Sequence, residues 1–295
     1  MALPVDTHVA LALAAALLFG FGPILSKRGL SADGTWLGNV LTVVGVRVAL
    51  FWVVLIATAG VGFLTDVTPV AVFLFAAAST AASGLGRMAF YVGVGRVGSS
   101  LSNAGANVRP MFAVVLASAW LGEAVTPRTV AGVSLLVAGL VVLSLSRGGD
   151  VGGWRRRELL YPLGAAFGYA LGNVVRRYGF TVTDLSTLQA LAFGETASLL
   201  TIAAYAVATG RLSDLRVTAR THALFAGNGV VAGVGLFFLF AALRRGPVAV
   251  VDPLIATAPL FTVAFAAVFL RELERITRGV VVGSLLIVVG AALVP

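Results

Sequence analysis

Three arginines and one glutamate lie within long apolar stretches of the sequence. The basic residues are Arg47, Arg87 and Arg109, and the acidic one is Glu195. A charged side chain at the centre of a membrane helix costs about 2.5–3.5 kcal/mol, so none of the four is expected to face lipid. They predict a buried site for a substrate or a coupling ion. A structural ion pair, such as Arg47 with Glu195, or an arginine that reaches an interface is the alternative.

Further polar residues surround Arg109 in the same stretch. Asn103, Asn107 and Pro110 are spaced four and three residues apart and share one face of a helix, whereas Arg109 is displaced by most of half a turn. A straight helix therefore cannot direct all of them into one cavity. Pro110 leaves the carbonyl of Ala106 without its helical partner and predicts a kink that re-aims Arg109.

Prolines and uncharged polar residues in the other apolar stretches complete the candidate site. Pro23 and Pro259 are expected to break their helices as Pro110 does. The other candidates for the lining of a cavity are Tyr91, Tyr169, Asn173 and Asn228. A tyrosine suits a membrane interface equally well, and the nearby glycines equally favour close packing of helices.

Three acidic residues outside this set are interpreted as structural. Asp252 follows the start of an apolar stretch and is interpreted as an interfacial residue; the alternative is a cavity position, because Asp252 and Thr257 occupy positions related to those of the polar residues around Arg109. Glu123 and Glu272 end two apolar stretches beside Arg128 and Arg271, where a carboxylate stays solvated, so a turn role is expected for both.

The sequence offers little for catalysis or for a cofactor. It has no cysteine and only two histidines, and no nucleotide-binding, zinc-protease or serine-hydrolase motif is present. We therefore predict that the protein is not an enzyme and binds no metal or cofactor. The net charge of +9 comes from basic residues scattered in short loops, which is typical of membrane anchoring and does not predict a nucleic-acid partner.

Composition and the length of the apolar stretches predict an all-α integral membrane protein. Hydrophobic residues make up 59% of the chain and charged residues 11%, against roughly 25% charged in soluble domains. A chain that crosses lipid must satisfy its own backbone, and stretches of about twenty apolar residues favour helices over a barrel. Ten transmembrane helices are predicted at about 8–27, 37–57, 69–94, 100–121, 128–146, 158–178, 185–208, 221–243, 248–270 and 278–294.

An internal duplication is predicted from residues that recur after 149 positions. Although chance matches are easy in a chain with 35 glycines, paired prolines, glutamates and basic doublets at one register favour duplication. With five helices in each half, the second half must be inverted. The predicted domains are a first repeat (1–147), a basic linker (148–157) and a second repeat (158–295). The matches include Lys27–Arg176, Arg28–Arg177, Gly86–Gly235, Arg96–Arg245, Pro110–Pro259, Phe112–Phe261 and Glu123–Glu272.

Three segments carry a resemblance to a known family. NVRPMFAVVLASAWLGE and TAPLFTVAFAAVFLRE resemble the fourth and ninth helices of the EamA family of the drug/metabolite transporter superfamily, and FGFGPILSKRG resembles its first helix. The resemblance implies two five-helix halves, a central cavity lined partly by helices four and nine, and export or exchange of small metabolites, often amino acids. Arg271 stands where the family has glycine before Glu272, so the second turn is less typical.

The sequence as a whole predicts a secondary transporter in the cell membrane that moves a small polar metabolite, of amino-acid or organic-acid type, by alternating access. The excess of arginine over glutamate inside the spans favours a carboxylate substrate, with Arg109 as the preferred clamp. The alternatives are a membrane-embedded enzyme and a lipid-handling or scaffold protein. Alternate loops carry 13 and 5 basic residues, which places both termini outside the cell. Coupling to an ion or a proton, the direction of transport and the oligomeric state stay open.

Overall fold

The computed structural model describes residues 6–60, 62, 67–146, 153–269 and 278–294, and this part of the chain contains no β-strand. The first half of the linker, Arg271 and Glu272 lie outside the described residues. The helices are α1 (Thr7–Leu30), α2 (Trp36–Ala59), α3 (Pro69–Ser79), the π-helical turn η2 (Thr80–Gly86), α4 (Arg87–Val97), α5 (Ser99–Ala106), α6 (Arg109–Leu121), α7 (Pro127–Leu145), η3 (Arg156–Leu159), α8 (Leu160–Val182), α9 (Thr187–Ala208), η4 (Leu212–Leu215), α10 (Ala219–Arg245), α11 (Val248–Ile255), α12 (Ala258–Phe269) and α13 (Arg278–Leu293).

Local signals in the sequence set many of these helix ends. The side chains of Thr35, Thr126 and Ser186 cap α2, α7 and α9 by accepting a hydrogen bond from a backbone N–H in the first turn. Pro127 occupies the first turn of α7, and Gly122 ends α6 with a φ of 64° that favours glycine. Each predicted span accordingly contains one helix or two to three consecutive helical elements.

Eight helical segments in the described residues are long and apolar enough to cross a membrane. Three of them are composite, since α3 continues through η2 into α4, α5 is followed by α6, and α11 by α12. Large apolar side chains cover their outer surfaces; Phe73 and Leu200, for example, are 69% and 65% exposed. Such a surface is stable in lipid and not in water, so the protein is a multi-pass integral membrane protein.

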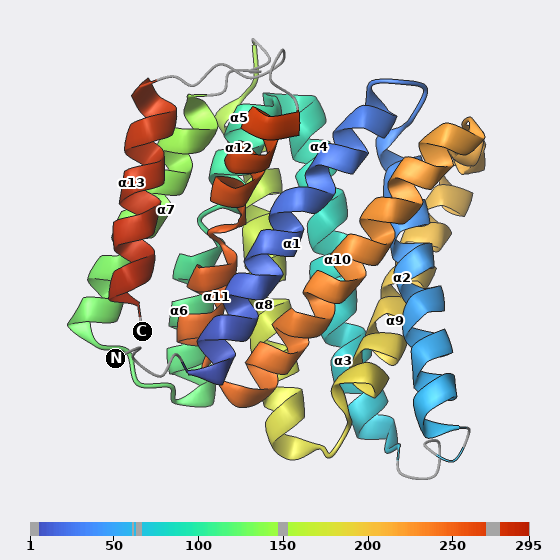
Figure 1. Ribbon diagram of the computed structural model, residues 1–295, viewed down its shortest axis with the longest axis horizontal. Coiled ribbons are helices and arrows are strands. Elements are labelled where there is room, and N and C mark those ends of the chain that lie inside the picture. The colour runs from blue at the N-terminus through green and yellow to red at the C-terminus, as the bar shows by residue number, and fades with distance from the viewer. Residues whose placement is uncertain (1–5, 61, 63–66, 147–152, 270–277, 295) are drawn as a thin grey trace.

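Contacts between loops define the two ends of the helix bundle. Asp33, which follows α1, accepts a hydrogen bond of 2.6 Å from the backbone N–H of Thr218, which precedes α10. Glu123, which follows α6, accepts hydrogen bonds from the start of α11. We call these the Asp33 end and the Glu123 end; they are the top and the bottom of Figure 1.

The two halves of the chain run in opposite directions through the bundle. The start of α1 lies at the Glu123 end, where His8 packs against Gly246 in the turn before α11. The start of α8 lies at the Asp33 end, where Glu158 contacts Arg96 at a distance of 3.6 Å (Figure 1). Two repeats of inverted orientation follow, as the odd number of spans in each half requires.

The packing of the helices repeats the same symmetry. α1 packs along α10, while its counterpart α8 packs along α3, η2 and α4; α2 pairs with α9, and α7 with α13. In the last pair, a side-chain carbon at Gly139 would lie 2.7 Å from the carbonyl oxygen of Gly283, and one at Gly290 would lie 2.7 Å from that of Gly132. These four glycines therefore let the backbones of α7 and α13 touch across a pseudo-twofold axis.

Candidate functional site

A cavity of about 1100 Å³ lies between the two repeats. Its lining begins at the helix breaks in the middle of the bundle and continues to Lys27, Leu30 and Ser99 at the Asp33 end. Among the described residues, none of the turn 122–126 belongs to the lining, so the cavity does not extend to the Glu123 end. Its volume is ample for a small metabolite.

A break between α5 and α6 brings several predicted residues into this cavity. α5 ends at Ala106 and α6 begins at Arg109, which changes the direction of the chain and lets Asn103, Asn107 and Arg109 all line the cavity. In a straight helix, Arg109 would point away from the face that carries Asn103 and Asn107, as their spacing in the sequence indicated. The matching break between α11 and α12 falls at residues 256–257, which are 149 positions after residues 107–108.

Two of the three predicted helix breaks occur at their prolines. Pro110 and Pro259 lie in the first turns of α6 and α12, directly after the breaks. The prediction for Pro23 is wrong, because α1 continues through it to Leu30. Gly22 and Gly29, on either side of Pro23, both press against side chains of α10, and these contacts keep the helix in line.

The ion pair suggested by the sequence is present between α2 and α9. Nη2 of Arg47 lies 2.6 Å from Oε2 of Glu195, and the two side chains are 1% and 0% exposed. The hydroxyl of Ser83, in the π-helical turn η2, donates to the other carboxylate oxygen at 3.1 Å. Because Glu195 lies behind Arg47, the carboxylate does not line the cavity.

A second buried ion pair joins α6 to α11. Nε of Arg109 lies 2.9 Å from Oδ2 of Asp252, and Nη2 of the same arginine donates to the backbone carbonyl of Asp252 at 3.3 Å. Asn173 donates to the other carboxylate oxygen. Asp252 is 0% exposed, so its interpretation as an interfacial residue is wrong. Asp252 is buried because α1, α6 and α8 pack against α11.

Arg176 is a buried basic residue of the cavity that the sequence analysis did not include among the candidate site residues. Its Nη1 donates to Asn173 at 2.8 Å, its Nη2 donates to Ser79 at 3.3 Å, and its guanidinium lies 4.7 Å from the ring centre of Phe240. The side chain is buried, and α8 continues past it to Val182, four residues beyond the predicted end of the span. Arg176 follows Asn173 by three residues and so shares its helix face, and this spacing was the feature of the sequence that could have identified Arg176 as a site residue.

Arg87 begins α4 and lines the cavity, and it forms no ion pair with a carboxylate of the described residues. Its Nε is buried and has no hydrogen-bond acceptor among the described residues. The ring of Tyr169 packs on the neighbouring Gly86, where a side-chain carbon would lie 3.4 Å away. Tyr91 follows Arg87 one turn later, and its hydroxyl accepts a hydrogen bond of 3.5 Å from Asn39. Arg87, Tyr91 and Tyr169 thus line one part of the cavity.

Neutral side chains complete the lining. Asn228 donates to Ser26 at 2.6 Å, and Ser26 donates to Asn39 at 2.9 Å, which joins α10, α1 and α2. Ser26 and Asn39 were not predicted, because an isolated serine or asparagine in an apolar run gives no signal of its own. Of the ten residues predicted to bind substrate, all except Glu195 line the cavity. Those nine are Arg47, Arg87, Tyr91, Asn103, Asn107, Arg109, Tyr169, Asn173 and Asn228.

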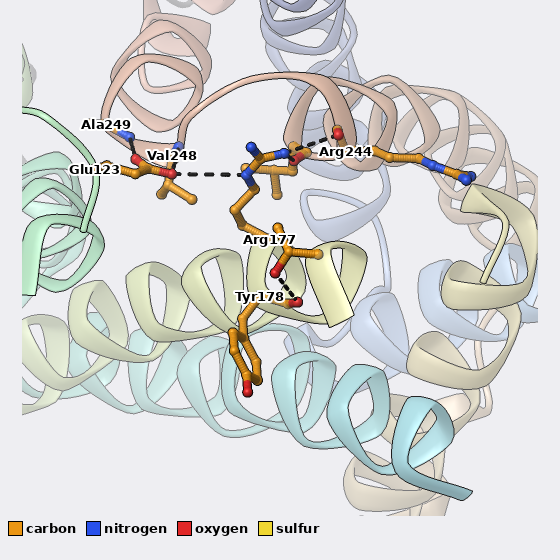
Figure 2. Close-up of polar contacts among 8 residues, drawn as sticks. Glu123, Arg177, Tyr178, Arg244, Val248 and Ala249 are labelled. Carbon is orange, nitrogen blue, oxygen red and sulfur yellow. Dashed lines mark hydrogen bonds and ion pairs between the residues drawn. The ribbon is translucent and has the colours of Figure 1, made fainter. Parts of the chain in front are cut away.

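A polar cluster closes the bundle at the Glu123 end (Figure 2). Both carboxylate oxygens of Glu123 accept hydrogen bonds of 2.9 Å, from the backbone N–H groups of Val248 and Ala249. Arg177 lies 4.0 Å from the same carboxylate and donates to the carbonyls of Leu243 and Arg244 at the end of α10. Glu123 is only 11% exposed. The prediction of a solvated carboxylate in a turn is therefore corrected: Glu123 caps the start of α11.

Two stretches of the chain, residues 7–145 and 156–294, match the EamA-like transporter family. The chain belongs to the EamA-like transporter family. A solved structure described only as "Crystal structure of protein" is 20% identical and superposes with a TM-score of 0.79, covering 98% of this chain and 96% of that one. At that identity the likeness supports the fold alone. No curated protein matches the chain.

Membership of this family places the cavity in a membrane transporter built of two repeats. The two matched stretches begin 149 residues apart, which is the register of the recurring residues and of the two helix breaks. The cavity of this EamA-family protein therefore lies where two homologous halves meet, the usual place for a substrate in such architectures.

Proposed function

We propose that this EamA-family protein is a secondary transporter with ten transmembrane helices that moves a small carboxylate-bearing metabolite across the cell membrane by alternating access. The observation that carries the proposal is the cavity between the repeats. It reaches one end of the bundle, is closed at the other and is lined by five basic residues. These are Lys27, Arg47, Arg87, Arg109 and Arg176.

The count of ten adds α8 and α13 to the eight apolar segments. α8 is less apolar because of its two arginines, yet Arg176 points into the protein and leaves a lipid-facing surface that includes Leu160 and Phe167, both exposed. α13 has 16 residues, which corresponds to about 24 Å of helix. The repeat register makes α8 the counterpart of α1 and α13 the counterpart of α7, and both counterparts are apolar enough to span.

Alternating access requires that the closed end can open. The contacts of Glu123 join α6 of the first repeat to α8 and α11 of the second, so they must separate before a solute could leave the cavity at this end. The basic loops favour the Asp33 end as cytoplasmic. In this orientation the structure corresponds to an inward-facing arrangement.

The site residues have distinct proposed roles. Arg47 and Arg109 are already neutralised by buried carboxylates and organise the site, whereas Arg87 and Arg176 provide positive charge to the cavity. The sequence analysis preferred Arg109 as the residue that binds the substrate carboxylate, and these roles assign that binding to Arg87 and Arg176 instead. Asn103, Asn107, Tyr91, Tyr169 and Asn228 would supply neutral hydrogen bonds, and the driving force would be a gradient of the solute or of an ion.

Transport by purified protein in liposomes tests the proposal against the enzyme, lipid-handling and scaffold alternatives. Liposomes loaded with one unlabelled carboxylate should accumulate the same labelled solute by counterflow, and protein-free liposomes should not. A double substitution of Arg87 and Arg176 by glutamine should abolish the accumulation. Stably folded protein that exchanged no member of a panel of amino acids and organic acids would contradict the proposed function.

A further inference from the structure

The cavity combines unneutralised positive charge with the absence of an acidic group in its described lining. Its basic lining residues include four arginines within the bundle, and two of them are paired, Arg47 with Glu195 and Arg109 with Asp252. No aspartate or glutamate lies among the described lining residues. The interior of the described protein thus retains the charges of two guanidinium groups, which is costly without a counter-ion.

Arg87 is the less satisfied of these two groups. Arg176 donates to two side chains and lies over an aromatic ring, so part of its binding capacity is used within the protein, although its Nε has no hydrogen-bond partner among the described residues. Arg87 makes no hydrogen bond or ion pair with any described residue, although its Nε is buried. A planar guanidinium presents paired donors that match a carboxylate or a phosphate. Tyr91 and Tyr169 beside it add an aromatic wall and two hydroxyl groups.

From these observations, and on the basis of the proposed transport function, we infer that the substrate is a small organic anion without an amino group, and that its acidic group binds Arg87. An amino acid carries an ammonium group that must donate its hydrogen bonds to an acceptor, and a charged ammonium prefers a carboxylate. Of the two intramembrane carboxylates among the described residues, Glu195 is bound by Arg47 and Ser83, and Asp252 by Arg109 and Asn173. An ammonium group would therefore lie in a positive field without a counter-charge.

The inference selects one of the two substrate types that the sequence left open. Carboxylic acids without an amino group carry a net negative charge and complement the cavity, whereas zwitterionic amino acids do not. Two excess guanidinium groups further favour a dianion, such as a dicarboxylate, over a monoanion. Charge complementarity also gives specificity, because a like charge in the cavity is repelled.

Matched pairs of solutes separate this inference from the proposed function. We would measure counterflow in proteoliposomes for lactate against alanine, and for succinate against aspartate, since the members of each pair differ mainly by the ammonium group. We expect exchange of the hydroxy or plain acid and at least tenfold slower exchange of the amino acid. Equal or faster exchange of alanine and aspartate would overturn the inference and leave transport intact. Exchange of no solute at all would instead contradict the proposed function.

Variants of Arg87 test the assigned position. The R87Q variant should raise the half-saturating anion concentration by about 10- to 100-fold, the range for loss of a charged hydrogen-bonded partner. R87K keeps the charge but lacks the paired donors of a guanidinium. Its half-saturating anion concentration should lie between those of R87Q and the wild type. R128Q, which removes an exposed arginine at the start of α7, is the matched control and should not change the affinity. Wild-type affinity in folded R87Q would overturn the assignment.

Discussion

Replacement of Glu123 by glutamine should shift the protein towards a state that is open at the Glu123 end. The carboxylate accepts two hydrogen bonds of 2.9 Å from the first turn of α11, whereas a glutamine amide can accept with its oxygen only. One charge-assisted hydrogen bond and the interaction with the helix dipole are lost, about 1.5–3 kcal/mol together. The partly exposed contact with Arg177 adds little, because its atoms are 4.0 Å apart.

Converted into populations, this loss corresponds to a roughly 10- to 150-fold larger fraction of molecules open at the Glu123 end. A cysteine in place of Ala113 reports this opening, since the native chain has no cysteine and Ala113 is fully buried on α6 between the cavity and that end. The rate at which a membrane-impermeant maleimide labels this cysteine from the Glu123 side is proportional to the open fraction, provided that closure is faster than labelling.

The matched control is D214N, which removes a carboxylate at the other end of the bundle. Asp214, in the short helix η4, pairs with Arg211 directly before that helix, so the pair does not hold the two repeats together at the closed end. We expect E123Q to increase the labelling rate by at least tenfold and D214N to leave it unchanged. A labelling rate in E123Q within twofold of the wild type would refute the assignment of Glu123 to the closure.

Three further predictions concern the buried charges, the α7–α13 contact and the orientation. R47Q should destabilise the detergent-solubilised protein by about 3–5 kcal/mol, because Glu195 is left charged in a dry site, and R47Q/E195Q should recover much of this loss. Leucine at Gly139 should lower the melting temperature, since overpacking costs about 1–3 kcal/mol. Single cysteines at Ser213 and Ala124, both exposed, should be labelled from the cytoplasmic and the external side, respectively.

Each of these predictions has a control or a contradicting outcome. Equal stability of R47Q and R47Q/E195Q would mean that the unpaired glutamate is not the cause of the loss. Alanine at Gly164, where a side-chain carbon meets nothing within 4 Å, is the control for Gly139 and should be nearly neutral. Labelling of the cysteine at Ser213 from outside intact cells would reverse the proposed orientation.

The spans and the repeat could be predicted from the sequence because their signals are local. An apolar run must be long enough to cross lipid, and prolines and glycines recur at fixed spacing whatever the helices contact. The depth of a charged residue depends on neighbouring helices and could not be predicted in this way. Arg176 was not predicted as a site residue because it lies near the end of its apolar stretch, and Asp252 was misplaced because α1, α6 and α8 pack against α11.

The backbone of this protein is close to symmetric between the repeats, but its charges are divided between them. The register that aligns the two helix breaks places Arg109 opposite Ala258, so duplication alone did not create this site. Both buried ion pairs cross between the repeats, with Arg47 and Arg109 in the first and Glu195 and Asp252 in the second. The pair between α2 and α9 joins two helices that are counterparts of each other, and elements beside a twofold axis move least when two halves exchange conformations. In the proposed alternating-access cycle, Arg47 and Glu195 are therefore suited to be the pivot, while the contacts of α6 with α11 and the cap at Glu123 would rearrange.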